Sequence, residues 1–259
     1  MRDSEIYLDT LHNMIDDMNL SLITGTPDYK FYRKHAYKTY NAAFLFTPFT
    51  RKFDVYYKMR LVPFGEQVPF TETFPLLKNF LEKFEWGEGN FSSGEEIVSF
   101  RVPRSKNTIA AENIGDEKIS HFRVPVVICF ESIFSNLVRK FVAKGADILV
   151  IITNDAWFGP TSAPFQHAQI AVFRAIENRI PIARCANTGV SMFINEYGKV
   201  LKSTRIFEST VLSHELPLRE GETFFFQNGH IFAIAVSLFN LVPLFFALIK
   251  PEKKKNNTV

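Results

Sequence analysis

Three apolar runs, each followed by polar residues, constrain the fold of this chain most strongly. They cover residues 124–129, 148–153 and 180–185, and amphipathic stretches at 132–144 and 166–178 lie between them. Apolar runs without alternation are typical of strands buried on both faces, and helices between such strands are typical of α/β domains. A hairpin across residues 195–199 adds antiparallel pairing. A four-layer αββα sandwich fits this pattern, and periodicity alone leaves a doubly wound sheet open.

Local patterns predict further elements. Apolar residues at helical spacing predict a helix over 4–18, and Phe74, Leu77, Leu81 and Phe84 mark one face of another helix over 69–86. The other predicted strands lie at 20–24, 40–46, 53–61, 96–102 and 211–216. We expect Gly25-Thr26-Pro27 to end the first of these strands. With 259 residues, the chain is long enough for one large domain with a sizeable core.

Charge and ligand spacing argue against several classes of function. The net charge is +3 and the basic residues are scattered except at the C-terminal end, so no nucleic-acid partner is predicted. The two cysteines, Cys129 and Cys185, do not make a disulfide framework. The six histidines and two cysteines show no HxxH or CxxC spacing, so neither a metal site nor a cofactor is predicted.

Residues 231–249 form an apolar stretch of 19 residues without a charge. As a helix it would span ~28 Å, close to the ~30 Å hydrocarbon core of a bilayer. A buried core helix is the alternative, but Asn240 and Pro243 are better tolerated in a membrane helix. Because four lysines lie within the tail 250–259, the positive-inside rule puts that tail in the cytoplasm and the α/β domain, residues 1–222, on the other face. Residues 1–20 contain neither a signal peptide nor an earlier span.

Cys129 ends the first apolar run, on the turn into the predicted helix, and Glu131 follows two residues later. Such a turn lifts a side chain out of the sheet edge, and a helix N-terminus favours a thiolate. A thiolate there is suited to act as a covalent nucleophile. The alternative is a small buried side chain, which most free cysteines are. Cys185 ends the third run without a following acidic residue, so we expect it in the core.

The segment YYKMRLVPFGE, residues 56–66, supplies other groups that thiol catalysis needs. Lys58 would hold a developing oxyanion, an interaction worth ~3–4 kcal/mol for one donor. Glu66 follows a turn that Gly65 permits and would orient Lys58 or an incoming amine. An exposed lysine and a solvated carboxylate are the alternatives. Asp155 and Trp157, in NDAWFG, follow a strand end where ligand-facing loops gather, or else form a capped turn with a packed tryptophan.

Together these segments resemble the nitrilase, or carbon–nitrogen hydrolase, superfamily, and within it the apolipoprotein N-acyltransferases of bacterial envelopes. The resemblance runs from about Leu20 to the C-terminus and is carried by YYKMRLVPFGEQVPF, VVICFESIF, NDAWFGPTSAPFQHAQIAVFRAIENRIPIAR, NTGVSMFINEYG and the terminal apolar stretch. It implies a nitrilase-like αββα sandwich followed by a transmembrane helix. It also implies a Glu-Lys-Cys triad that transfers an acyl chain from a phospholipid, through a thioester, to the α-amino group of a lipoprotein N-terminal diacylglyceryl-cysteine.

The resemblance assigns roles to particular residues. Cys129 matches the nucleophile and Lys58 the family lysine, while Glu66 and Glu131 match two accessory glutamates beside the active site. Trp157 matches the tryptophan that lines the acyl pocket, and Asn41 a residue that supports the site. The implied location is the bacterial inner membrane, with the α/β domain on the periplasmic side.

Departures from the family pattern lower the expected activity. The family's base glutamate, in a Trp-Pro-Glu type motif on the first strand, would precede residue 4, and Glu5 does not match it. We therefore expect a chain that lacks the first strand and the N-terminal membrane helices, and that is impaired because base catalysis contributes ~10²–10⁴-fold. Phe130 stands where many members have tyrosine, and Gln227 where a basic residue is expected. The alternatives are an amidase acting on a small amide and a fragment that binds lipid or a partner without turnover.

Overall fold

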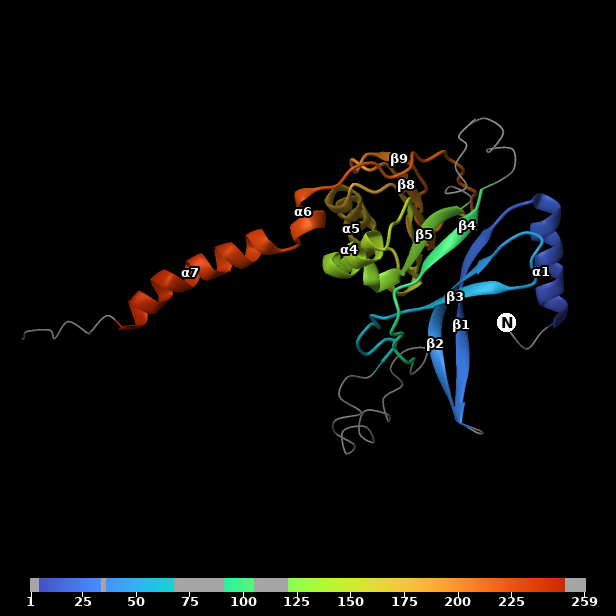
Figure 1. Ribbon diagram of the computed structural model, residues 1–259, viewed down its shortest axis with the longest axis horizontal. Coiled ribbons are helices and arrows are strands. Elements are labelled where there is room, and N and C mark those ends of the chain that lie inside the picture. The colour runs from blue at the N-terminus through green and yellow to red at the C-terminus, as the bar shows by residue number, and fades with distance from the viewer. Residues whose placement is uncertain (1–4, 34–35, 68–90, 105–120, 250–259) are drawn as a thin grey trace, which may run out of the picture.

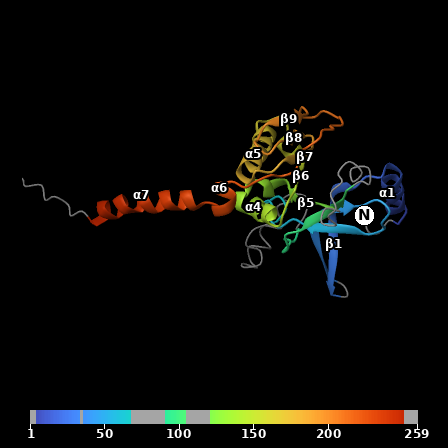
Figure 2. The same ribbon diagram turned by 45° about the horizontal axis from the view of Figure 1, so that its top comes forward.

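The computed structural model describes residues 5–33, 36–67, 91–104 and 121–249. The predicted helix over 69–86, with its face of Phe74, Leu77, Leu81 and Phe84, lies outside these residues. Two sheets pack face to face, and helices cover their outer faces (Figures 1 and 2). This order of layers is the predicted αββα sandwich, and the doubly wound alternative is wrong because one face of the larger sheet is covered by a sheet.

The first sheet has three antiparallel strands in the order β1 (Leu22–Arg33), β2 (Ala36–Phe46) and β3 (Phe53–Tyr57). The prediction that Gly25-Thr26-Pro27 ends the first strand was wrong, since β1 continues through these residues and Pro27 pairs with Asn41. Proline is tolerated because β1 is an edge strand of the described sheet. A Cβ at Gly25 would lie 2.9 Å from the Ile152 side chain of the other sheet, so the glycine lets the sheets approach.

The second sheet has six strands, in the order of the chain: β4 (Ser99–Pro103), β5 (His121–Ile128), β6 (Leu149–Asn154), β7 (Ile182–Asn187), β8 (Met192–Ile194) and β9 (Val200–Ser203). The three apolar runs form β5, β6 and β7, which pair in parallel, while the outer strands pair antiparallel. The predicted strand over 211–216 is absent, and those described residues have no regular structure. Because β5, β6 and β7 are parallel, the residues that follow them lie together at the carboxyl ends of these strands.

Alternation along β2 divides the core into two layers. Ala43 and Leu45 pack against the six-stranded sheet, whereas Ala42, Phe44 and Phe46 form a second cluster with Ile15. Ile15 lies on α1 (Glu5–Met18), which confirms the predicted first helix and covers the outer face of the three-stranded sheet. On the far side, α4 (Ser135–Ala143) and α5 (Ala163–Asn178) bury apolar faces against the six-stranded sheet.

The C-terminal region leaves the sandwich as two helices. The short α6 (Phe224–Asn228) is fastened to the domain, where Arg139 donates to the Phe226 carbonyl at 3.0 Å and Thr223 to the Glu177 carbonyl. The apolar stretch then forms α7 (Ile231–Ile249), which extends away from both sheets (Figure 1), and its side chains from Ile231 to Pro243 are all exposed. Within the described residues, no helix has the length and apolarity needed to cross a membrane, so the transmembrane prediction for 231–249 is not confirmed.

Candidate functional site

Cys129 lies directly after β5, on a turn that its backbone makes in the left-handed region, with φ of +51°. An L-residue in this region is strained by about 1–2 kcal/mol, and such strain persists where the surroundings hold the backbone in place. Cys129 is the first residue of a short 3-10 helix, η2 (Cys129–Ile133), and the α-helix α4 begins only at Ser135. The prediction of a turn at Cys129 is confirmed, but the helix predicted over 132–144 begins only at Ser135, so backbone geometry rather than a helix N-terminus presents the half-buried thiol.

Lys58 follows β3 and is completely buried. Its Nζ donates to both carboxylate oxygens of Glu66, at 2.9 and 2.7 Å. Glu66 also accepts from Asn41 Nδ2 at 2.6 Å and from the Val62 amide at 2.8 Å. The sequence-predicted residues Lys58, Glu66 and Asn41 thus form one hydrogen-bonded group in which the ammonium has a fixed position.

The turn that returns Glu66 to Lys58 differs from its prediction in one respect. The left-handed residue is Phe64, with φ of +62°, and not Gly65. Gly65 matters for space instead, because a Cβ there would lie 3.2 Å from the Val62 side chain. The Gly65 and Glu66 amides both donate to the Val62 carbonyl, which closes the turn.

Glu131 joins the two segments that carry Lys58 and Cys129. Its Oε1 accepts from the Tyr56 hydroxyl at 2.6 Å and from the Met59 amide at 2.7 Å, and its Oε2 accepts from the Ile128 amide at 2.8 Å. Burial raises the pKa of Glu131, while the hydrogen bonds from Tyr56 and the backbone oppose this shift. Burial and the neighbouring carboxylate raise the pKa of Tyr56, so its hydroxyl stays protonated and donates. Glu131 therefore holds the residue after Lys58 and the residue before Cys129 together.

A second buried network lies beside Cys129, around Asp155. The Asp155 carboxylate accepts from Thr153 Oγ1 at 2.9 Å and from Arg184 Nη2 at 2.8 Å, and its Oδ1 lies 2.9 Å from His167 Nδ1. Burial alone would raise the pKa of Asp155, but the hydrogen bonds and positive charge of His167 and Arg184 lower it to about 2. A Cβ on Gly189 would come within 2.3 Å of Asp155 Oδ2, so the NTG turn leaves room for this carboxylate.

Three of these residues have the donor types of a metal centre. Cys129 Sγ, an oxygen of Asp155 and a ring nitrogen of His167 lie within 4.8 Å of one another. Both Asp155 oxygens already accept hydrogen bonds, however, and the buried guanidinium of Arg184 beside them opposes a cation. The group has the arrangement of a hydrogen-bond network.

Two sequence predictions concern side chains at the surface. Trp157, in η3 (Ala156–Phe158), is 59% exposed beside the Asp155 network, so it does not form a packed turn. Cys185 is exposed on β7, and its prediction as a core residue was wrong because the alternate residue Arg184 points into the domain in its place.

Sequence reasoning missed Tyr56, His167 and Arg184 as parts of the site. A signal for His167 exists in α5, where the buried face consists mainly of alanines together with polar residues. A polar residue on a face of small side chains has to find a buried partner. Asp155 was singled out, but nothing local in the chain shows that α5 and β7 supply its partners.

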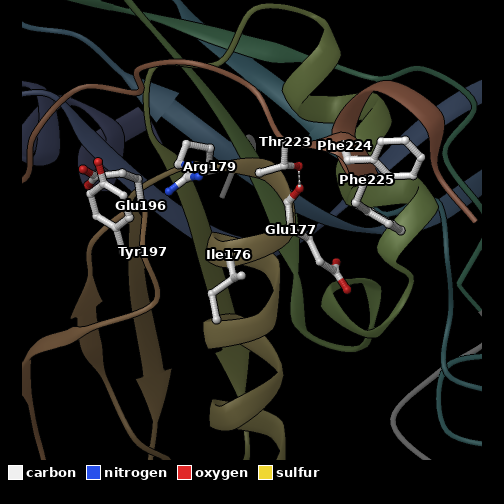
Figure 3. A pocket seen from close by; sticks show the side chains of 8 residues that line it. All are labelled: Ile176, Glu177, Arg179, Glu196, Tyr197, Thr223, Phe224 and Phe225. Carbon is white, nitrogen blue, oxygen red and sulfur yellow. Dashed lines mark hydrogen bonds between the residues drawn. The ribbon is translucent and has the colours of Figure 1, made fainter.

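A surface pocket of about 460 Å³ lies away from these residues, between the end of α5, the β8–β9 turn and α6 (Figure 3). Arg179, Glu196, Tyr197 and Phe224 line it, and none of its lining residues belongs to the group around Cys129. Thr223 and Glu177 are joined there by the hydrogen bond that fastens α6. The pocket therefore belongs to the attachment of the C-terminal helices.

With a buried lysine–glutamate pair and a cysteine at the edge of an αββα sandwich, the chain can be compared with known families. Residues 4–224 match the model of the carbon–nitrogen hydrolase family. The chain belongs to this family. It is similar in fold to a crystal structure of an amidase from Nesterenkonia sp., with a TM-score of 0.53 at 16% identity, covering 89% of this chain and 72% of that one.

The relatives with higher identity have a more specific name. The chain is 35% identical over 234 residues to the apolipoprotein N-acyltransferase of Geobacter metallireducens, covering 90% of this chain and 41% of the relative. It is 36% identical over 236 residues to that of Chlorobaculum tepidum, covering 86% of this chain and 42% of the relative. The chain thus spans about two fifths of the length of these relatives.

Proposed function

We propose that this chain carries the acyl-transfer site of an N-acyltransferase of bacterial lipoprotein maturation. In this proposal Cys129 takes an acyl chain from a phospholipid and passes it to the α-amino group of a lipoprotein N-terminal diacylglyceryl-cysteine. The observation that carries the proposal is the joining, through Glu131, of the strained Cys129 turn to the Lys58–Glu66 pair. It is supported by the similarity to a relative named apolipoprotein N-acyltransferase over 90% of the chain.

Two displacements at carbonyl carbon make up the reaction. The Cys129 thiolate attacks the phospholipid ester, the C–O bond breaks, and the lysophospholipid leaves as an alcohol after taking up a proton. The amine then attacks the thioester, the C–S bond breaks, and the nitrogen loses a proton as the amide forms. Lys58 faces the oxyanion of each tetrahedral intermediate, a role worth about 3–4 kcal/mol for one donor. Glu66 keeps Lys58 in place, and Asn41 keeps Glu66 in place.

The family resemblance assigns the deprotonation of the Cys129 thiol to a glutamate that would precede residue 4. A general base contributes ~10²–10⁴-fold to such a step. We therefore expect acylation of Cys129 to rise by about that factor when the chain is joined to a segment that supplies this glutamate.

The proposal also includes contact with a membrane. The side chains of α7 from Ile231 to Pro243 are all exposed, and a helix that is apolar all round is stable in lipid. Trp157 is exposed beside the Asp155 network, where an acyl chain would contact it. The relatives' name favours the bacterial inner membrane as the location. The lysines of the tail favour an orientation with the domain on the periplasmic side and the tail on the cytoplasmic side.

Mass spectrometry after incubation with phospholipid vesicles tests the proposal. We expect an acyl adduct on Cys129 that hydroxylamine removes and that a diacylglyceryl-cysteine peptide discharges with formation of an amide. C129A should show no adduct, and C185A should behave as the parent does. Ammonia release from small amides without an adduct from phospholipid would instead indicate an amidase. Binding of vesicles with neither reaction would indicate a module without turnover.

A further inference from the structure

The carbonyl group of Cys129 is held by side chains that the proposed acyl transfer does not use. Ser132 Oγ donates to the Cys129 carbonyl at 2.8 Å, and His167 Nε2 lies 3.2 Å from the same oxygen. His167 Nε2 also lies 3.0 Å from Ser132 Oγ. These contacts come from α5 and from η2, and they meet at the residue whose backbone is strained.

The ring of His167 has a second fixed contact. Its Nδ1 lies 2.9 Å from Asp155 Oδ1, and Arg184 Nη2 donates to the other oxygen of Asp155. Arg184 in turn donates to the Val190 carbonyl. The exposed fractions of Asp155, His167 and Arg184 are 1%, 7% and 3%, so the network is shielded from water.

Stability alone does not account for this network. Replacing buried ion pairs by apolar residues of similar volume is often neutral or stabilising. A left-handed non-glycine residue, in contrast, needs neighbours that hold it, because other backbone conformations are lower in energy. Cys129 has such neighbours, since Glu131 holds the amide of the preceding residue, Ile128, and His167 lies at the carbonyl of Cys129.

We propose that His167 is a positioning residue for the nucleophile. A carbonyl oxygen only accepts hydrogen bonds, so the contact with Cys129 places a proton on Nε2 of His167. The ionised Asp155 fixes the orientation of the ring from the other side, and Arg184 fixes Asp155. The network thereby keeps the Cys129 turn left-handed and Sγ directed toward the substrate. This inference rests on the proposed function only in taking Cys129 as the nucleophile.

Glutamine and asparagine at position 167 distinguish the contact of ring atom Nε2 from that of ring atom Nδ1. The amide nitrogen of glutamine occupies roughly the place of His Nε2, and that of asparagine roughly the place of His Nδ1. H167Q therefore keeps a donor for the Cys129 carbonyl, whereas H167N keeps only the contact with Asp155. H167A removes the contacts on both sides of the ring.

The measurement is the alkylation rate of each cysteine by iodoacetamide, followed by mass spectrometry. Cys185 serves as an internal reference because it is exposed on β7. We expect H167A and H167N to slow alkylation of Cys129 about tenfold, which corresponds to one hydrogen bond. H167Q should restore the rate to within about twofold of the parent. Alkylation of Cys185 should be the same in all four proteins.

Three results would overturn the inference. Equal slowing by all three variants, or a rate for H167N equal to that of the parent, would show that the Cys129 carbonyl contact has no role. Faster alkylation of Cys185 in step with changes at Cys129 would show a general loosening of the domain. Because alkylation needs neither phospholipid nor lipoprotein, a failed acyl-transfer assay with this pattern intact would reject the proposed function and leave the positioning role standing.

Discussion

Substituting Glu131 by glutamine tests whether one carboxylate holds together the segments that carry Lys58 and Cys129. Glu131 is fully buried, and each group around it is a donor. Three of the donors, Tyr56 and the Met59 and Arg60 amides, meet Oε1, while the Ile128 amide meets Oε2. Glutamine has nearly the same shape but one acceptor oxygen. Its NH₂ group must therefore face at least one donor.

The expected loss of stability follows from these contacts. With the glutamine oxygen in the place of Oε1, the Ile128 amide loses its acceptor, which costs about 1–3 kcal/mol. The three remaining hydrogen bonds change from charge-assisted to neutral and lose about 1 kcal/mol each. Relief of burying a charge, the same effect that raises the pKa of Glu131, offsets part of this loss. We expect a net decrease in the free energy of unfolding of about 2–4 kcal/mol for E131Q.

Urea unfolding followed by circular dichroism measures this decrease, with E215Q as the matched control because Glu215 is exposed. The alkylation rate of Cys129 should fall as well, since the Ile128 amide immediately precedes the strained residue. An E131Q protein within about 0.5 kcal/mol of the parent, with unchanged Cys129 reactivity, would refute the reasoning, because surface substitutions alone have effects of that size.

Three further substitutions have defined outcomes. K58M should lower the rate of thioester formation about 10²–10³-fold, because it removes the proposed oxyanion donor. Mass spectrometry in a time course measures this rate, and a rate like the parent's would remove Lys58 from the proposed mechanism. G94A should lower the free energy of unfolding by about 1–3 kcal/mol, measured in urea; its Cβ would lie 2.2 Å from the Tyr57 carbonyl oxygen. For D155N the pH dependence is diagnostic: the carboxylate has a pKa of about 2 in the folded state against an ordinary 3.8. Its stabilisation, about 2.5 kcal/mol, is present above pH 3.8 and is lost as the pH falls through 2, so the advantage of the parent over D155N should shrink between pH 4 and pH 2 in unfolding curves.

The fold could be predicted where buried strands leave a continuous apolar pattern. The runs that became β5, β6 and β7 have this pattern because both faces of their sheet are covered. The error in β1 has a tertiary cause: the space that Gly25 leaves is filled by Ile152 of the other sheet, and Pro27 is acceptable only on an edge strand. Neither condition is visible in the local sequence, where glycine and proline indicate a turn.

The same distinction between local signals and tertiary contacts applies to the prediction of the site. Lys58 and Glu66 are close in sequence, so a single turn can bring them together, and the motif could be interpreted as one unit. His167 and Arg184 are 12 and 29 residues from Asp155, on different elements, and only the parallel order of β6 and β7 with α5 between them brings the three together. Their partners follow from topology rather than from spacing.

The two buried networks act on neighbouring residues of the chain, Ile128 and Cys129. Glu131 holds the amide of Ile128, the residue before the strained one, and His167 with Ser132 holds the carbonyl of Cys129 itself. The N–Cα bond of Cys129, whose φ is positive, lies between these two held groups. Because Glu131 also binds the amides of Met59 and Arg60, the same contacts join the Cys129 turn to the Lys58 segment. Residues from β3, η2 and α5 therefore act together to hold the turn that carries Cys129.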